Sequence, residues 1–256
     1  MLVKTLVVTG RGGVGKTTFS ALTIRYLRER GSLLVVDADP DESLASALGL
    51  EPAAAGVRTV SALLYDVKFQ TLDPALKRSI PARPDQIQYL FHQEGIYEGP
   101  GFDLFALGVK WGDGCYCQPN AMLKAIVKSS AKSYAMAVMD SPAGLEHLNR
   151  RITAEVDSIF ALVGPSKKSF DNVQRARRIC QEVGIIFRNF YVVANYEFPD
   201  DLVDTISERT GLTCLGKVPY EEEIARRLLQ GEGLLDIDDS SPACQAVCSM
   251  LQRAGY

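Results

Sequence analysis

A glycine-rich segment near the start of the chain could bind phosphate groups. Residues 10–17 read GRGGVGKT and match the pattern G-x-x-x-x-G-K-[ST], with a β-branched run before them and an amphipathic stretch after them. We expect Lys16 to bind the β- and γ-phosphates, Thr17 to complete a Mg²⁺ shell and Thr18 to contact the α-phosphate. A glycine-rich turn without a ligand is the alternative. The backbone that would surround the phosphates belongs to Gly10, Gly12, Gly13, Val14 and Gly15.

Three aspartates stand where expected strands end. Asp37 and Asp39 follow an apolar run in LLVVDADPD, and Asp140 ends another in YAMAVMDSPAG. The carboxyl ends of parallel strands are where such folds bind ligands. One carboxylate there can hold Mg²⁺ directly or through water, and another can orient an attacking water. An isolated aspartate at a strand end is usually a turn or capping residue. Its combination with the phosphate loop favours a site for phosphoryl transfer.

A second pattern, WGDGCYCQPN, places Cys115 and Cys117 one residue apart. Residues i and i+2 of an extended segment project to the same side, so two thiolates could bind one metal ion. A zinc-like site needs about four ligands, and a single chain supplies only two of them here. A redox pair, two buried cysteines and a pair of iron–sulfur ligands are the alternatives.

The elements that would position these residues follow from the apolar pattern. Apolar runs alternate with amphipathic stretches, which predicts an α/β fold: one P-loop domain over residues 1–256, with a mostly parallel sheet of about seven or eight strands and helices on both faces. Loops and short helices over one sheet edge are expected for residues 52–101. Strands are expected at Leu2–Thr9, Leu33–Asp37, Asp103–Leu107, Tyr134–Asp140, Ser158–Val163, Phe187–Ala194 and Thr213–Lys217. Helices are expected at Lys16–Arg30, Asp41–Leu48, Ala121–Ser130, Leu145–Thr153, Ser169–Val183, Asp200–Thr210, Glu221–Leu229 and Pro242–Arg253.

Composition and charge exclude several classes of protein. The chain has 256 residues, of which 46% are hydrophobic, so it can bury a substantial core. No window approaches the roughly 18 apolar residues of a membrane span, and the first residues do not form a signal peptide. A net charge of -3 provides no broad attraction for DNA or anionic lipid, so neither nucleic acid nor membrane is an expected partner. We expect a cytoplasmic protein, with Cys180, Cys214, Cys244 and Cys248 in the core or on a buried helix face.

The segments GRGGVGKTT, VVDADPD and VMDSPAG resemble those of the deviant Walker A ATPases, which include the nitrogenase iron protein and the septum-positioning and plasmid-partition ATPases. The resemblance covers most of the chain. It implies a homodimer that sandwiches two ATP molecules and changes state on hydrolysis. It also implies that Asp39 belongs to switch I and positions the water, and that Asp37 lies near Mg²⁺. Asp140 and Gly144 would begin switch II.

The same resemblance implies two further contacts, and the sequence departs from the family's pattern at one position. Asn195 and Pro219 look like the family's adenine contacts, although both could be ordinary loop residues. The family has a signature lysine at the position of Arg11, where it reaches across the dimer to the partner's phosphates. Arginine keeps the charge but changes the geometry. We expect Arg11 to act across the dimer, and a solvent-facing loop arginine is the alternative.

The wider stretch FDLFALGVKWGDGCYCQPNAMLKAI, followed by DSPAGLEHLNR, is similar to the nickel-insertion ATPases that mature carbon monoxide dehydrogenase. In a two-fold dimer, Cys115 and Cys117 of both subunits would place four thiolates around one nickel or zinc ion. The resemblance implies that the ATP state governs association and release of the metal to a client apo-enzyme. A partition or septum-positioning ATPase and an iron–sulfur electron-transfer ATPase are the competing interpretations.

Overall fold

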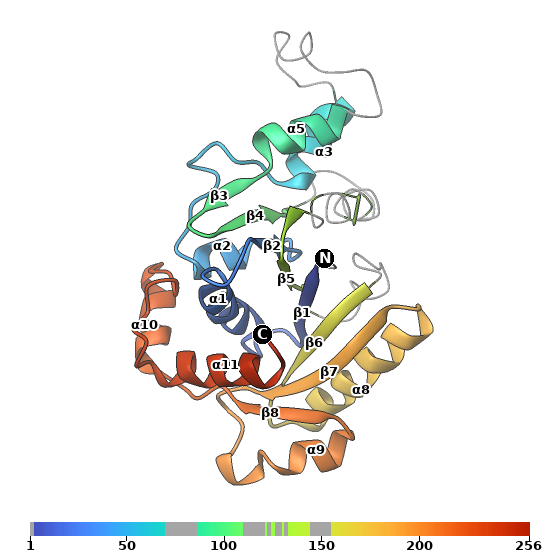
Figure 1. The fold of residues 1–256 in the computed structure, drawn as a ribbon, viewed down its shortest axis with the longest axis vertical. Helices are drawn as coiled ribbons and strands as arrows, with labels where there is room; N and C mark the ends of the chain where they lie inside the picture. The colour runs from blue at the N-terminus through green and yellow to red at the C-terminus, as the bar shows by residue number, and fades with distance from the viewer. Residues whose placement is uncertain are drawn as a thin grey trace.

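The structure is a computed structural model that describes residues 3–69, 86–109, 121, 124, 125, 130, 133–143 and 155–256. Within these ranges an eight-stranded sheet has the order β3-β4-β2-β5-β1-β6-β7-β8 (Figure 1). Neighbouring strands are parallel except β3 and β4. The predicted α/β class with a mostly parallel sheet is therefore confirmed. The strands are β1 (Lys4–Gly10), β2 (Leu33–Asp37), β3 (Tyr97–Gly99), β4 (Phe102–Ala106), β5 (Met136–Asp140), β6 (Glu155–Val163), β7 (Ile186–Ala194) and β8 (Thr213–Lys217).

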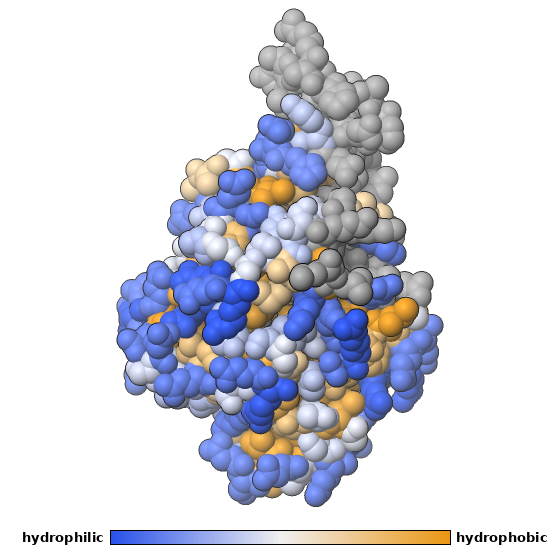
Figure 2. Space-filling view, viewed as in Figure 1, coloured by the Kyte–Doolittle hydropathy of each residue, from blue (hydrophilic) through white to orange (hydrophobic). Residues whose placement is uncertain are grey.

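Helices cover both faces of the sheet because alternate strand residues point to opposite sides. In β1, Leu6 and Val8 belong to one apolar core and Val7 belongs to the other. The first core also contains residues of α1 (Lys16–Leu27), α2 (Ser43–Ala47), α10 (Glu222–Gln230) and α11 (Pro242–Arg253). The second contains residues of α3 (Val60–Phe69), α5 (Gln86–Glu94), α8 (Lys167–Glu182) and α9 (Thr205–Thr210). On the face in Figure 2, polar residues cover much of the described surface, with small apolar groups between them.

The strand order places a ligand site at one edge of the sheet. After β1 the chain moves through α1 to β2, whereas β6, on the opposite side of β1, leads to β7 and β8. The order therefore reverses at β1, and such switch points leave a crevice at the carboxyl ends of the strands. The register pairs Asp140 with Val8 on one side and with Asp37 on the other. The predicted phosphate loop and two of the predicted aspartates consequently meet at this edge.

Several boundaries differ from the sequence-based expectations. The strand β3 was not expected, because three residues are too short to display an alternating pattern. The irregular region does contain helices, α3 and α5, as expected. The helix expected over Asp200–Thr210 is divided into the 3₁₀ helix η2 (Asp200–Leu202) and α9, and α1 ends at Leu27 rather than at residue 30. The helix expected over Leu145–Thr153 lies outside the described residues, as does most of Ala121–Ser130.

The cysteines that the structure describes lie close to their expected places. Cys180 and Cys244 are buried, and Cys214 and Cys248 are half-buried against the apolar cores. No helix in the described ranges is long and apolar enough to cross a membrane.

Candidate nucleotide-binding site

The loop between β1 and α1 has the tight backbone expected of a phosphate loop. A Cβ on Gly10 would lie 2.9 Å from the carbonyl oxygen of Leu162 and 2.9 Å from a methyl carbon of Val14, so the position requires glycine. Gly15, which precedes α1, has φ of 92°, in the region that glycine alone adopts without strain. The loop therefore delivers the chain to the helix N-terminus, where free N–H groups and the helix dipole favour an anion.

Lys16 is a buried cation with spare hydrogen-bonding capacity. Lys16 is only 7% exposed. Its ammonium donates to the carbonyl oxygen of Arg11 at 3.3 Å, which is its one hydrogen-bond acceptor in the part of the chain that the structure describes. Burial lowers the pKa of Lys16, while the charges of Asp140 and Asp39 oppose this shift. Since an ammonium has three donors, the site can accommodate an anionic ligand such as a phosphate.

Asp140 contacts the helix that follows the loop. The residue is 1% exposed, and its carboxylate accepts hydrogen bonds from the Thr17 hydroxyl and the Ser20 hydroxyl, each at 2.9 Å. Burial raises the pKa of Asp140 to about 6, although these two hydrogen bonds and the charge of Lys16 act in the opposite direction. The Thr17 hydroxyl also lies 3.2 Å from the Ser43 hydroxyl at the start of α2. Thr17 therefore connects the start of α1 to the end of β5 and to the start of α2.

Asp37 and Asp39 organise the turn after β2 in this structure. The two carboxylate oxygens of Asp37 accept from the backbone N–H groups of Asp39 and Leu44, both at 3.0 Å. Burial raises the pKa of Asp37 well above its usual value, and the charge of Asp140 adds to the increase. The carboxylate of Asp39 accepts from the N–H of Asp41 at 3.2 Å. The predicted roles of Asp37 near Mg²⁺ and of Asp39 in positioning water stay predictions.

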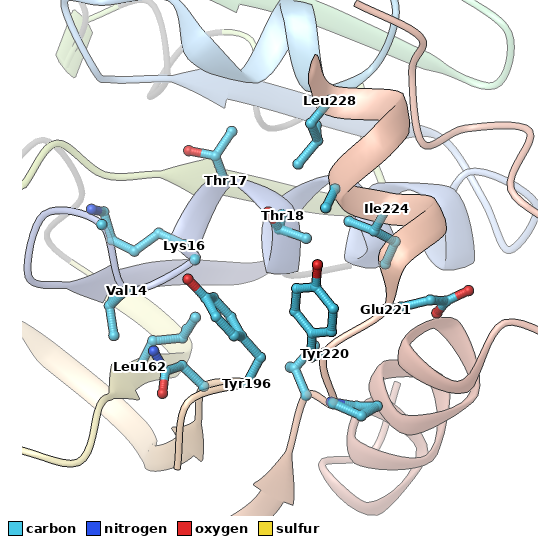
Figure 3. Close-up of a pocket in the computed structure, with 16 residues that line it drawn as sticks. Val14, Lys16, Thr17, Thr18, Leu162, Tyr196, Tyr220, Glu221, Ile224 and Leu228 are labelled. Atoms are coloured by element: carbon cyan, nitrogen blue, oxygen red, sulfur yellow. The ribbon is translucent and has the colours of Figure 1, made fainter. Parts of the chain in front are cut away.

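A cavity of about 390 Å³ extends from the phosphate loop to the loops after β7 and β8 (Figure 3). Asn195 and Pro219, which the sequence suggests as adenine contacts, both line it. Asn195 is buried, and its side-chain oxygen has no hydrogen-bond partner among the described residues. Its amide nitrogen donates to a Glu197 carboxylate oxygen at 3.4 Å. An unpartnered buried acceptor that lines a cavity is suited to an N–H group of a ligand. The predicted loop residues on the cavity wall are Gly13, Val14, Gly15, Lys16, Thr17 and Thr18.

Sequence reasoning missed several contributors to this site. Ser20 had a usable signal, since it lies three residues after Thr17 and therefore on the same helix face. Tyr196 and Tyr220 directly follow Asn195 and Pro219, but only the folded chain brings the two tyrosines together. The remaining side of the cavity is formed by Ile224, Ala225 and Leu228 of α10.

The residues expected to act between subunits are described only in part. Arg11, Gly12 and Gly13 are exposed on the single chain, which leaves Arg11 accessible to a second subunit. Cys115, Cys117 and Gly144 lie outside the described residues. Within the described ranges, no group of three or more His, Cys, Asp and Glu side chains could hold a metal ion.

A mostly parallel sheet with a glycine-rich loop before its first helix, a buried lysine at the start of that helix and a cavity beside them defines a P-loop nucleotide-binding protein. Comparison with known proteins identifies the particular family. Residues 5–235 match the CobQ/CobB/MinD/ParA nucleotide binding domain, and the chain belongs to this family.

Relatives extend over nearly the whole chain. An uncharacterized ATP-binding protein of Methanocaldococcus jannaschii is 35% identical, over 97% of this chain and 97% of that protein's length. The carbon monoxide dehydrogenase accessory protein CooC of Rhodospirillum rubrum is 27% identical, over 98% of this chain and 97% of its own. Among solved structures, the septum site-determining protein MinD of Pyrococcus horikoshii, complexed with Mg-ADP, superposes with a TM-score of 0.70 at 17% identity, covering 99% and 96% of the two chains. This last similarity concerns the fold.

Proposed function

We propose that the protein binds ATP with Mg²⁺ and hydrolyses it to ADP and phosphate. The observation that carries the proposal is that the phosphate loop and Asn195 line one cavity, while Thr17 on the same wall donates a hydrogen bond to Asp140. Each belongs to a different part of the chain, and together they supply groups for phosphates, a metal ion and a base. Membership of a nucleotide-binding family supports the same conclusion.

The residues at the carboxyl ends of the strands would have separate roles in the reaction. Lys16 and the loop N–H groups would bind the phosphate oxygens and hold the γ-phosphate in line for attack. Thr17 and Asp140 would hold Mg²⁺, because a hydroxyl and a carboxylate already in contact are oxygen ligands of the kind this ion prefers. Asp37, which the sequence suggests for this ion, pairs with Asp140 on the neighbouring strand and would lie near it. When bound, Mg²⁺ neutralises charge on the phosphate oxygens. Asp39 would orient the attacking water after switch I rearranges, and Arg11 would bind phosphates of the partner subunit.

The finer proposal is that this ATPase is a metallochaperone that inserts nickel into carbon monoxide dehydrogenase. Its support is the Cys-x-Cys segment together with the similarity to the CooC accessory protein over nearly the full length. The connection that contains Cys115 and Cys117 leaves the sheet after β4, at the same edge as the nucleotide site. Leu107 begins this connection, and its N–H donates to the carbonyl oxygen of Asp37 at 2.8 Å. A change around Asp37 would therefore act directly on the start of this connection.

A metal titration of the purified protein tests this proposal. Dimerisation and metal stoichiometry are measured with nickel and with zinc, in the presence and absence of a non-hydrolysable ATP analogue. We expect about one ion per dimer, in agreement with four thiolate ligands. The Cys115→Ser/Cys117→Ser variant should lose the ion, whereas the matched control Cys248→Ser should keep it. Metal retained by the double variant would contradict the proposed ligands.

The proposed role of Arg11 is tested by ATP-dependent dimerisation and turnover. Arg11→Ala should suppress both, because the charge that reaches the partner's phosphates is lost. Arg11→Lys should retain most of the activity, since the related ATPases use lysine there. Unchanged turnover in Arg11→Ala would show that this arginine does not act across the dimer.

The second candidate function is that of a partition or septum-positioning ATPase, which the fold similarity to MinD favours. The C-terminal helix offers little to such a role, because Ala243, Val247 and Leu251 of α11 are buried in the core. Co-sedimentation with DNA or lipid vesicles, without metal binding, would support this candidate and contradict the metallochaperone proposal. Visible absorbance of anaerobically purified protein would indicate an iron–sulfur cluster instead.

A further inference from the structure

Two cysteines of α11 lie one helical turn apart, outside the lining of the nucleotide cavity. Cys244 is 2% exposed, and Cys248 is half-buried against the same apolar core. Residues four apart on a helix share one face, with their Cβ atoms about 5–6 Å from each other, so both sulfurs can contact one ion. The proposed nucleotide site and the proposed Cys115/Cys117 site use neither thiol.

Arg25 of α1 lies beside this cysteine pair, since α1 packs against α11 (Figure 1). Its guanidinium donates to the Cys244 sulfur at 3.2 Å and to the carbonyl oxygen of Ile237 at 2.8 Å. It also donates to a carboxylate oxygen of Asp239 at 2.5 Å, but the Asp239 side chain is 93% exposed, so water screens this ion pair. The Nε atom of Arg25 is buried and has no hydrogen-bond partner among the described residues. A positive charge with an unused donor therefore lies next to Cys244.

The position of Cys244 favours a negative charge on its sulfur once the proton is removed. Cys244 lies in the first turn of α11, where its N–H donates to the Ser241 hydroxyl oxygen at 3.1 Å and the helix dipole stabilises an anion. Burial nevertheless raises the pKa of Cys244 to about 11, and the neighbouring Cys248 thiol adds to this increase, whereas the charge of Arg25 opposes it. The Cys244 thiol therefore keeps its proton at neutral pH unless a strongly thiophilic ion displaces it.

The number of ligands restricts the kind of ion. Within the ranges that the structure describes, no third His, Cys, Asp or Glu side chain joins this pair in a metal site, whereas zinc and nickel usually take about four ligands. Two thiolates alone suit a soft monovalent cation such as Cu⁺, which binds them in a line. The complex of two thiolates with such an ion carries one negative charge, which needs a counter-charge when it is buried. Arg25 supplies that charge.

We propose that Cys244 and Cys248 form a binding site for Cu⁺ or a similar soft monovalent ion, with Arg25 as the counter-charge. One ion binds both sulfurs, the two thiol protons leave to the solvent, and no electron is transferred. The half-buried Cys248 provides the side from which the ion enters. The site is independent of the nucleotide cavity and of Cys115 and Cys117.

Competition with a coloured Cu⁺ chelator under anaerobic, reducing conditions tests the site. The full chain carries Cys115→Ser/Cys117→Ser, so that the Cys-x-Cys segment cannot bind the ion. We expect one Cu⁺ per chain, with two sulfur neighbours in X-ray absorption. Adding Cys248→Ser should lower the affinity by more than about 100-fold, because losing a ligand costs more than losing a hydrogen bond to a ligand. The matched control Cys214→Ser changes another half-buried cysteine and should leave the affinity unchanged.

Arg25→Gln tests the counter-charge, and Hg²⁺ is the comparison ion because its complex with two thiolates is neutral. Loss of the charged hydrogen bond should weaken Cu⁺ binding by about 10-fold to 150-fold and leave Hg²⁺ binding nearly unchanged. Arg25→Lys keeps the charge and should retain more of the Cu⁺ affinity than Arg25→Gln does. Unchanged Cu⁺ affinity in Cys248→Ser, an equal loss in Cys214→Ser, or three or more sulfur neighbours would overturn the proposed site. Equal losses of Cu⁺ and Hg²⁺ binding in Arg25→Gln would overturn the role of Arg25.

Discussion

Replacement of Asp140 by asparagine should make the protein more stable and less active. Asp140 is 1% exposed, and burial raises its pKa from 3.8 to about 6. One pKa unit corresponds to about 1.4 kcal/mol, so the ionised carboxylate destabilises the nucleotide-free fold by about 3 kcal/mol at neutral pH. Asparagine has the same shape, keeps an oxygen for the Thr17 hydroxyl and removes the charge. We expect Asp140→Asn to increase the free energy of unfolding by about 1–3 kcal/mol at pH 7.5.

The effect has a defined pH dependence. Because the native pKa of Asp140 lies above the unfolded value, the native state binds more protons than the unfolded state between about pH 4 and pH 6. This carboxyl therefore lowers the stability of the wild type as the pH rises through that window. The asparagine variant lacks the titration, so its advantage should grow by about 1.5 kcal/mol between pH 5 and pH 7.5.

Urea unfolding followed by circular dichroism at both pH values measures this difference, and ATP hydrolysis is measured on the same preparations. Hydrolysis should fall sharply in Asp140→Asn, because the proposed Mg²⁺ ligand is lost. Asp201→Asn is a suitable control, since Asp201 is an exposed carboxylate far from the loop in sequence, and it should change stability by less than about 0.5 kcal/mol. An Asp140→Asn variant that is no more stable than the wild type at pH 7.5 would refute the reasoning.

Two more predictions concern the packing behind the site and the edge of the base. A Cβ on Gly233 would lie 2.3 Å from backbone atoms of Leu48 and Gly49, so Gly233→Ala should lower the free energy of unfolding by about 2 kcal/mol. Urea unfolding should show a smaller loss for Gly231→Ala, where no atom lies within 4 Å and the cost comes from the φ of 72° alone. Asn195→Ala should weaken ATP binding by about tenfold in calorimetric titration, because its unpartnered oxygen is lost as an acceptor. An equal loss for inorganic triphosphate would argue against a contact with the base.

Local features of this protein could be predicted from the sequence because they depend on neighbouring residues. The phosphate loop is a contiguous segment whose glycines and lysine adopt their positions through local backbone geometry. The central strands could be predicted in the same way, since β2 and β5 are short apolar runs that are buried on both faces. The edge strand β3 was missed because its pairing with β4 depends on a partner rather than on its own pattern.

The assembly of the site was decided by the tertiary structure. The sequence identified Asp140, Asn195 and Pro219 as candidates, but it could not show that Asp140 binds the hydroxyls of Thr17 and Ser20. It also gave no reason to connect Tyr196 with Tyr220. These contacts join segments that are distant in the chain, and they form because the strand order brings the carboxyl ends of β1, β5, β7 and β8 to one edge. Cross-strand hydrogen bonds and core packing set that order, and no local pattern encodes it.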